Sequence, residues 1–219
     1  MKSFQNKKPV IAIDGTSGSG KGTLAVNLCR EISFDHLDSG SLYRIVALKL
    51  LDNGNLESSL KELIINFNEI EKIKKEYRDN LRSEEVSILS SKIAKKKEVR
   101  DFLLQFQRNF ANNPPKGFGS VIDGRDIATI IIPNAEVKIY VDADLRIRAS
   151  RRLNQLGFGE DKYHDVLKSL EERDQNDKKR KESPLMITDE SFFIDTSKIN
   201  ENEVVQKAMN YIKKKIDYI

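Results

Sequence analysis

The segment Gly15–Thr23 (GTSGSGKGT) constrains the fold of this 219-residue chain more than any other feature. It follows the apolar run Pro9–Asp14, which indicates a buried parallel strand. Apolar residues then recur every four positions from Leu24 to Ile32, which predicts a helix. In this order the loop matches G-x-x-x-x-G-K-[ST] with one extra glycine, Gly22. Glycines let backbone N–H groups face an anion, and the helix N-terminus adds positive potential.

We therefore expect the loop to hold the phosphates of ATP, although a plain Gly/Ser-rich turn is the alternative reading. The residues expected to contact the nucleotide are Gly15, Thr16, Ser17, Gly18, Ser19, Gly20, Lys21, Gly22 and Thr23. Lys21 can reach the outer phosphates, which makes it a catalytic candidate, and the Thr23 hydroxyl is placed near Mg²⁺. The motif does not identify the phosphate acceptor.

Composition narrows the class of protein. Lys plus Arg is 38 and Asp plus Glu is 34, a net charge of +4 that is too mild to imply nucleic-acid binding. The single cysteine, Cys29, excludes an intrachain disulfide and is predicted to be a small core residue. The sequence has no apolar run of membrane-spanning length and no signal-peptide stretch. We expect a cytoplasmic monomer with small-molecule partners, without nucleic acid or membrane.

Strand and helix patterns alternate along most of the chain, which predicts an α/β fold with a mostly parallel sheet and helices on both faces. Further strands are predicted at 120–123, 137–142 and 192–196, with a strand end and turn at 37–40. Asn200 and Glu203 have the spacing of a capping box for the last helix. Residues 57–100 are rich in Lys and Glu, and we predict a mostly helical insertion there.

Two short segments pair arginine with polar residues near predicted strand ends. In the first, Ser39 is predicted to cap a helix and Arg44 lies in its first turns, although a plain cap with a surface arginine is equally consistent. In the second, Asp123–Asp126 (DGRD) ends a buried strand at the carboxyl edge, where open α/β sheets bind ligands. Asp123 is a candidate carboxylate near Mg²⁺.

Two helical faces further along the chain carry clustered charges. Arg148, Arg151 and Arg152 lie at i, i+3 and i+4, and Arg173, Asp177 and Arg180 lie at i, i+4 and i+7. Either face could be a solvated, salt-bridged surface. Beside a phosphate loop, they suggest a lid that closes on two phosphate groups, with Gly157–Gly159 as a hinge. His36 and His164 fall in no motif and are expected to be ordinary polar residues.

Over nearly its whole length the chain resembles the bacterial cytidylate kinases. The segments that carry the resemblance are GTSGSGKGT, LDSGSLYR, EEVSILSSKIAKKKEVR, IDGRDIAT, VKIYVDA, RASRRL, ERDQNDKKR and FFIDTS. The resemblance implies a P-loop NTPase-type fold and transfer of the γ-phosphate of ATP to CMP or dCMP with Mg²⁺. It also implies one domain, with a core of 1–56, 101–142 and 188–219, a nucleoside-monophosphate-binding insertion at 57–100 and a lid at 143–187.

The resemblance also implies roles for individual residues. Ser39, Arg44 and Arg125 would hold the acceptor nucleotide and its phosphate, whereas Ser91, Arg100 and Asp126 would read the cytosine ring. Arg173, Asp177 and Arg180 would hold the sugar and the transferring phosphate, and the lid residues Arg148, Arg151 and Arg152 would contact ATP. Catalytic roles are expected for Lys21, Arg125, Asp177 and Arg180, and metal binding for Thr23 and Asp123.

One segment departs from the family pattern. The family's insertion contains a run of short strands, whereas Leu63–Asn80 is short and charged and lacks strand alternation. A shortened, helical insertion leaves the choice among CMP, dCMP and UMP open. Two other functions also remain open at this point: a nucleotide-binding module that uses the basic lid on nucleic acid, and a kinase for a different nucleoside monophosphate.

Overall fold

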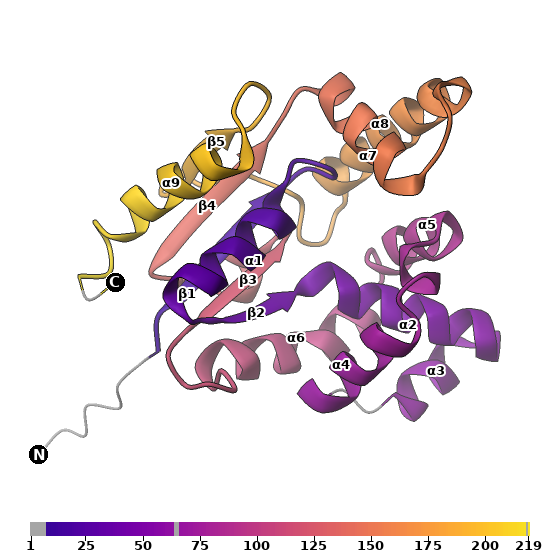
Figure 1. Ribbon diagram of the computed structural model, residues 1–219. Coiled ribbons are helices and arrows are strands. Elements are labelled where there is room, and N and C mark those ends of the chain that lie inside the picture. The colour runs from indigo at the N-terminus through magenta and orange to yellow at the C-terminus, as the bar shows by residue number, and fades with distance from the viewer. Residues whose placement is uncertain (1–7, 64–65, 218) are drawn as a thin grey trace, which may run out of the picture. The chain divides into compact units, whose positions relative to one another are not determined.

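A computed structural model describes residues 8–63, 66–217 and 219, which form two compact units (Figure 1). The first unit comprises the chain up to Leu37 together with Phe110–Ile219, and the second comprises Asp38–Asn109. The predicted insertion at 57–100 falls within the second unit. In the described ranges, no helix combines the length and hydropathy needed to cross a lipid bilayer.

The first unit is built on a five-stranded sheet with the order β2-β3-β1-β4-β5. The strands are β1 (Val10–Gly15), β2 (Asp35–Asp38), β3 (Ser120–Gly124), β4 (Val137–Asp142) and β5 (Phe192–Asp195). β1 pairs in parallel with both β3 and β4, and β4 pairs in parallel with β5. The predicted α/β class with a parallel sheet is confirmed. The carboxyl ends of these strands share one edge, so the segments that follow them lie close together.

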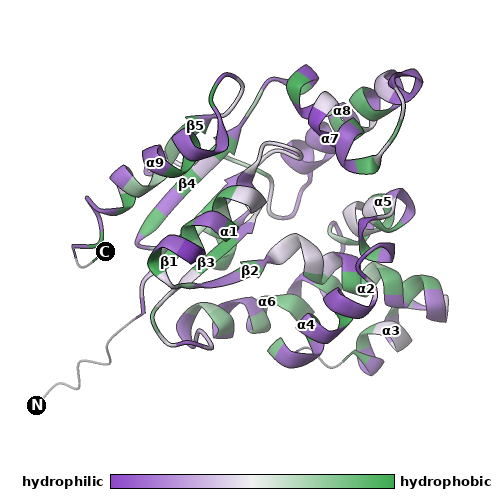
Figure 2. Ribbon diagram, in the orientation of Figure 1, coloured by the Kyte–Doolittle hydropathy of each residue, from purple (hydrophilic) through white to green (hydrophobic). Residues whose placement is uncertain are grey.

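Helices α1 (Lys21–Ile32) and α9 (Glu201–Ile212) pack against each other and against the sheet. Their buried residues join those of the strands in one core, which includes Ile11, Leu28, Ile139 and Ile212. Figure 2 shows hydrophobic and hydrophilic residues alternating along α9, as expected for a helix with one buried face. The predicted capping box of Asn200 and α9 is present.

The predicted lid region contains α7 (Leu145–Leu156), η3 (Glu160–Lys162) and α8 (Tyr163–Lys179). α7 and α8 pack through a small cluster of their own, formed by Ala149, Leu153, Val166 and Leu170. Gly157 ends α7 in the left-handed conformation, with φ of 68°. The two helices therefore form a packed pair with a small core of their own, and their role as a lid stays a prediction.

Apart from Asp38, the last residue of β2, the described part of the second unit is helical, and the described residues of 57–100 contain no strand, which confirms the prediction for that segment. Its elements are α2 (Ser39–Asn53), α3 (Leu56–Glu62), α4 (Phe67–Glu76), η1 (Asn80–Arg82), α5 (Glu84–Ile93) and most of α6 (Lys97–Asn112). α2 contacts α3, α4 and α5 and buries Leu42, Ile45 and Val46. Residues 64–65 of the departing segment lie outside the described residues.

The prediction that Ser39 caps this helix is wrong by one position. Asp38 is the N-cap of α2, and its Oδ1 accepts a hydrogen bond of 3.0 Å from the backbone N–H of Ser41. Ser39 is the first helical residue, and it is buried. A carboxylate caps a helix as well as a hydroxyl does, so the cap motif alone could not choose between the two neighbours.

Candidate active site

The loop Gly15–Gly20 connects β1 to α1 and lies tightly against β4. Gly15 has φ of 156°, and a Cβ atom there would lie 2.0 Å from the carbonyl oxygen of Val141. Gly18 and Gly20 have φ of 74° and 91°, in the left-handed region that favours glycine. Gly20 is the N-cap of α1 and has no side chain, so no side chain caps the first turn of α1, the end of a helix that favours anions.

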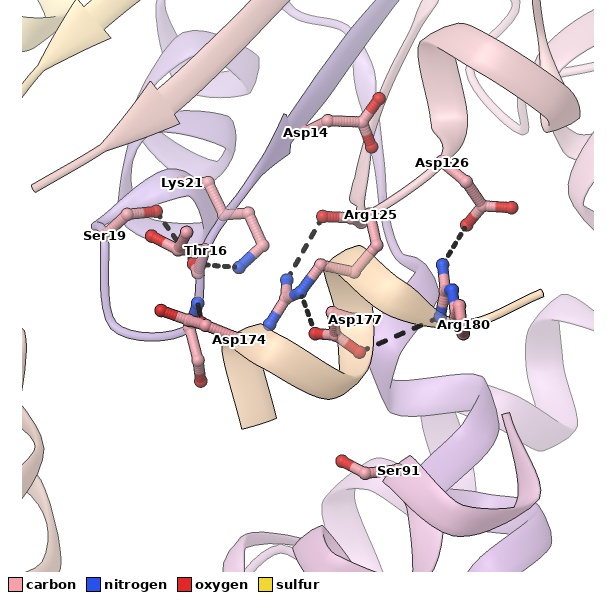
Figure 3. Close-up of polar contacts among 12 residues, drawn as sticks. Asp14, Thr16, Ser19, Lys21, Ser91, Arg125, Asp126, Asp174, Asp177 and Arg180 are labelled. Atoms are coloured by element: carbon pink, nitrogen blue, oxygen red, sulfur yellow. Dashed lines mark hydrogen bonds and ion pairs between the residues drawn. The ribbon is translucent and has the colours of Figure 1, made fainter. Parts of the chain in front are cut away.

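Side chains within and beneath the loop fix its shape (Figure 3). The Nζ of Lys21 and the hydroxyl of Ser19 both donate to the carbonyl oxygen of Thr16, over 3.1 and 3.0 Å. The Thr16 hydroxyl donates to Oδ1 of Asp142, at the end of β4, over 2.5 Å. The loop is thus held in a single shape by its own residues and by the neighbouring strand.

Arg148 is buried between the loop and α8. Its Nη1 donates to Oδ2 of Asp174 over 2.6 Å and to the carbonyl of Ser17 over 3.1 Å, and its Nε donates to Ala143. Both Arg148 and Asp174 are less than 10% exposed. The structure therefore gives Arg148 several protein partners beneath the loop, while its predicted contact with ATP stays a prediction.

The other two lid arginines have different surroundings. Arg151 donates to both the hydroxyl and the carbonyl oxygen of Thr196, and the Thr196 hydroxyl in turn donates to the Ser19 carbonyl over 2.9 Å. Arg152 donates to Gln155 on the exposed side of α7. Of the three arginines, two are tied to the frame of the phosphate loop, which their helical spacing alone did not indicate.

Arg125, Asp177 and Arg180 form a charged cluster, as Figure 3 shows. The Nε of Arg125 donates to Oδ2 of Asp177 over 2.8 Å, and Nη1 of Arg180 lies 3.9 Å from Oδ1 of Asp177. Burial raises the pKa of Asp177, but the charges of Arg125, Arg173 and Arg180 and the hydrogen bond from Arg125 outweigh it, so the net pKa lies below its ordinary value. Asp177 is therefore ionised at neutral pH.

Asp126 joins this cluster from the loop after β3. Its Oδ1 lies 3.5 Å from Nη2 of Arg180, and both side chains are about 5% exposed. The structure thus brings together four predicted residues from segments more than fifty positions apart: Arg125, Asp126, Asp177 and Arg180. Arg125 and Arg180 both lie against Asp177, and guanidinium groups suit an anionic ligand with several oxygen atoms.

Asp123 and Thr23 provide oxygen atoms near the start of α1. Asp123 is 4% exposed; its Oδ1 contacts Nε2 of His36 at 2.8 Å, and its Oδ2 lies 3.9 Å from where a Cβ of Gly22 would be. Within the described residues, no group of three or more His, Cys, Asp or Glu side chains could hold a metal. One carboxylate and one hydroxyl fit Mg²⁺, which keeps several waters and binds substrate phosphates.

Arg173 lies on α8 in the first unit, and four further predicted residues, Ser39, Arg44, Ser91 and Arg100, belong to the second unit. Ser39 accepts a hydrogen bond of 3.2 Å from Gln107, and Ser91 donates to the carbonyl of Ser87, one turn earlier on α5. The guanidinium of Arg100 lies 5.9 Å from the centre of the Tyr43 ring and also donates to Ala94. The Nε of Arg44 is buried without a hydrogen-bond partner among the described residues. None of these contacts tests the substrate-binding roles of the four residues, which stay predictions.

Three acidic or basic residues with evident roles were not anticipated: Asp14, His36 and Asp174. Asp14 was treated only as the end of a strand, yet a carboxylate that closes a fully apolar run is itself a signal, because burying a charge is costly without partners. His36 was expected to be an ordinary polar residue, and its contact with Asp123 depends on strand order. Cys29, by contrast, packs against the core as predicted, and burial raises its pKa to about 12, which disfavours the thiolate at neutral pH.

Comparisons with known proteins agree with the geometry. The family model described as Cytidylate kinase matches residues 11–214. The chain is similar to a cytidylate kinase of Vibrio vulnificus, with 37% identity over 97% of this chain and 99% of the relative. It is 39% identical to one of Vibrio cholerae, over 95% and 97% of the two chains. A solved protein of Eubacterium ventriosum shares the fold, with a TM-score of 0.51, 17% identity and coverage of 97% and 100%.

Proposed function

Because the chain belongs to the cytidylate kinase family, we propose that it transfers the γ-phosphate of ATP to CMP or dCMP and releases ADP with CDP or dCDP. The observation that carries this proposal is the cluster of Arg125, Asp177 and Arg180, which lies in the same compact unit as a complete phosphate loop. A loop alone accounts for the donor. The added buried cations account for a second phosphate group, that of the acceptor.

The proposed chemistry relies on positioning and charge neutralisation. Lys21 and the loop bind the outer phosphates of ATP, and Arg125 and Arg180 neutralise the acceptor phosphate and the group in transfer. The acceptor phosphate is already an anionic nucleophile, so no side chain has to remove a proton. Asp177 accepts from Arg125 and holds its guanidinium in place, which lowers the reorganisation needed during transfer.

Mg²⁺ is part of the proposal. Thr23 and Asp123 would hold it, through the hydroxyl at the start of α1 and the carboxylate at the end of β3. When bound, the ion would supply positive charge that offsets the charge of the phosphates. The contact of His36 with Oδ1 of Asp123 fixes the orientation of this carboxylate.

Recognition of the acceptor is proposed for the residues that the family resemblance implies. Asp126 suits the cytosine amino group, because a carboxylate accepts from that donor and repels the carbonyl oxygen that uracil has in its place. Ser91 and Arg100 are proposed to contact the base, Ser39 and Arg44 the acceptor nucleotide, and Arg173 its sugar and phosphate. We also propose that the protein acts as a cytoplasmic monomer, as the sequence led us to expect.

The test is an NADH-coupled assay of ADP release with ATP, Mg²⁺ and one of CMP, dCMP, UMP, AMP or GMP. We expect turnover with CMP and dCMP and a slower rate with UMP. A Lys21→Ala variant, purified in the same way, should have a kcat at least about a hundredfold lower than the wild type. Activity that remains in this variant measures the contribution of contaminating kinases. Turnover confined to AMP or GMP would replace the proposed acceptor, and no turnover with any of the five would refute the proposal.

A further inference from the structure

Asp14 occupies an unusual position for a carboxylate, because it is 1% exposed at the end of the central strand β1. Its Oδ1 accepts a hydrogen bond of 2.9 Å from the backbone N–H of Ile127, and its Oδ2 accepts one of 2.8 Å from Ala128. Both oxygen atoms thus serve backbone groups from a segment more than a hundred residues away. The phosphate loop begins at the next residue, Gly15.

The two N–H groups belong to the first turn of η2, a short π-helix (Ile127–Ile131). The ladder of this helix runs from Ile130 and Ile131 to the carbonyl of Asp126, and from Ile132 to that of Ile127. As in any helix, the first N–H groups cannot find a carbonyl within the helix. Asp14 supplies their acceptors from another strand and so acts as the cap of η2.

The residue at the N-cap position of η2 is Asp126, and its side chain does not cap the helix. Aspartate at an N-cap ordinarily turns back onto the N–H groups of its own first turn. Here the Asp126 carboxylate is directed instead to Arg180, 3.5 Å away, and Arg125 beside it contacts Asp177. Figure 3 shows Asp14 extending from β1 and the Asp126 carboxylate facing Arg180.

We propose that Asp14 is a positioning residue for the acceptor side of the site: it caps η2 in place of Asp126 and so keeps Asp126 and Arg125 directed toward the acceptor nucleotide. This inference rests on the proposed function for the identity of the acceptor. It assigns a functional role to the residue before the phosphate loop that is distinct from ATP binding. The charges that face Asp14 are those of Arg125 and Asp126.

The variant Asp14→Asn tests the proposal, because it keeps the shape but replaces one acceptor with an N–H donor that faces a backbone N–H. Asp35→Asn is the matched control. Asp35 is 5% exposed in the same unit, and its carboxylate also accepts from a backbone N–H, that of Lys116, over 2.7 Å. It lies at the opposite end of β2 from the strand ends that carry the site.

For Asp14→Asn we expect the KM for CMP to rise about tenfold or more. A rise of this size corresponds to the loss of one hydrogen bond to a charged group. The KM for ATP should change by less than about threefold, which is well below the change expected for CMP. Asp35→Asn should change neither value. Equal rises in both KM values, or a rise no larger than that of the control, would overturn the proposal, since they indicate a merely structural role.

Amide hydrogen exchange provides a second readout that needs no activity. The amides of Ile127 and Ala128 should exchange about tenfold faster or more in Asp14→Asn than in the wild type. If the wild type fails to phosphorylate CMP while this effect is present, the proposed acceptor falls and the positioning of η2 stands. If Asp14→Asn does not fold, the wild type decides: protection as high as that of β1 amides supports the proposal, and exchange as fast as that of loop amides overturns it.

Discussion

The Nε of Arg125 donates to Oδ2 of Asp177 over 2.8 Å and thereby joins the loop after β3 to the last turn of α8. Both side chains are at most 15% exposed. A pair so shielded from water is strongly coupled, and the loss of one partner leaves a buried charge behind. Arg125 is proposed to neutralise the phosphate in transfer and Asp177 to hold Arg125 in place, so stability and activity depend on one contact.

Replacing Asp177 with Asn should therefore destabilise the protein by about 3 kcal/mol and lower kcat, because Arg125 loses its charge partner. Urea denaturation and the coupled assay measure the two effects. A double-mutant cycle with Arg125→Met should show coupling well above that of the exposed pair Glu57–Lys61, whose removal should leave the unfolding midpoint unchanged. Additive effects at Arg125 and Asp177 would contradict the assigned contact.

Replacing Asp126 with Ala should reduce the preference for CMP over UMP more than it affects ATP. The carboxylate is proposed to accept from the cytosine amino group, and one such contact discriminates by about 1 to 3 kcal/mol, or roughly tenfold to a hundredfold in the ratio of kcat/KM values. Rates with CMP and UMP at saturating ATP give this ratio. An unchanged ratio would remove Asp126 from base recognition.

The stability of the protein should depend on pH through Asp14. Burial raises its pKa to about 7, against the opposing effect of the N–H groups of Ala128 and Ile127. A carboxyl whose pKa is higher in the folded state than in the unfolded state binds its proton more tightly when folded. Asp14 therefore stabilises the fold fully below about pH 4, where it is protonated in both states. This contribution, up to about 4 kcal/mol, is lost as pH rises from about 4 through about 7.

Urea denaturation of the wild type and Asp14→Asn at pH 5 and pH 8 checks this dependence. Between these values the free energy of unfolding should fall further with rising pH in the wild type than in the variant. The difference between the two proteins isolates Asp14 from carboxylates such as Asp177, whose lowered pKa affects stability only below about pH 4. Parallel pH profiles for the two proteins would contradict the prediction.

Replacing Gly15 with Ala should cost several kcal/mol of stability or prevent folding, since its Cβ would lie 2.0 Å from the Val141 carbonyl oxygen in a φ region that favours glycine. Gly54→Ala is the matched control. Its φ is 66° and no atom lies within 4 Å of its Cβ position, so only the backbone cost of about 1 kcal/mol applies. Thermal unfolding compares the two, and equal costs would show that β4 can move away.

Replacing Arg148 with Met should destabilise the fold by about 3 kcal/mol, because it leaves the Asp174 carboxylate buried without its closest cation. Replacing Arg152, whose hydrogen bond to Gln155 lies on the exposed side of α7, with Ala should change the free energy of unfolding by no more than about 0.5 kcal/mol and raise the KM for ATP. Denaturation and the coupled assay separate the two roles. An Arg148→Met variant as stable as wild type would show that its contacts are dispensable.

The sequence by itself determined the phosphate loop, the parallel α/β class and the helical character of 57–100. These features depend on local patterns: a strand that stops at Gly15, apolar residues at helical spacing from Leu24, and charged periodicity without strand alternation. Such patterns act within one or two elements, so they can be read without knowing which segments meet.

Only the tertiary structure decided which charges meet. The pairs Arg148–Asp174, His36–Asp123 and Asp14 with the start of η2 join segments 26, 87 and 113 or more positions apart. Their partners follow from the strand order and from burial, where a charge persists only if it is matched. A helical face of arginines is compatible with a ligand or a carboxylate, and the fold alone supplies the carboxylate for Arg148.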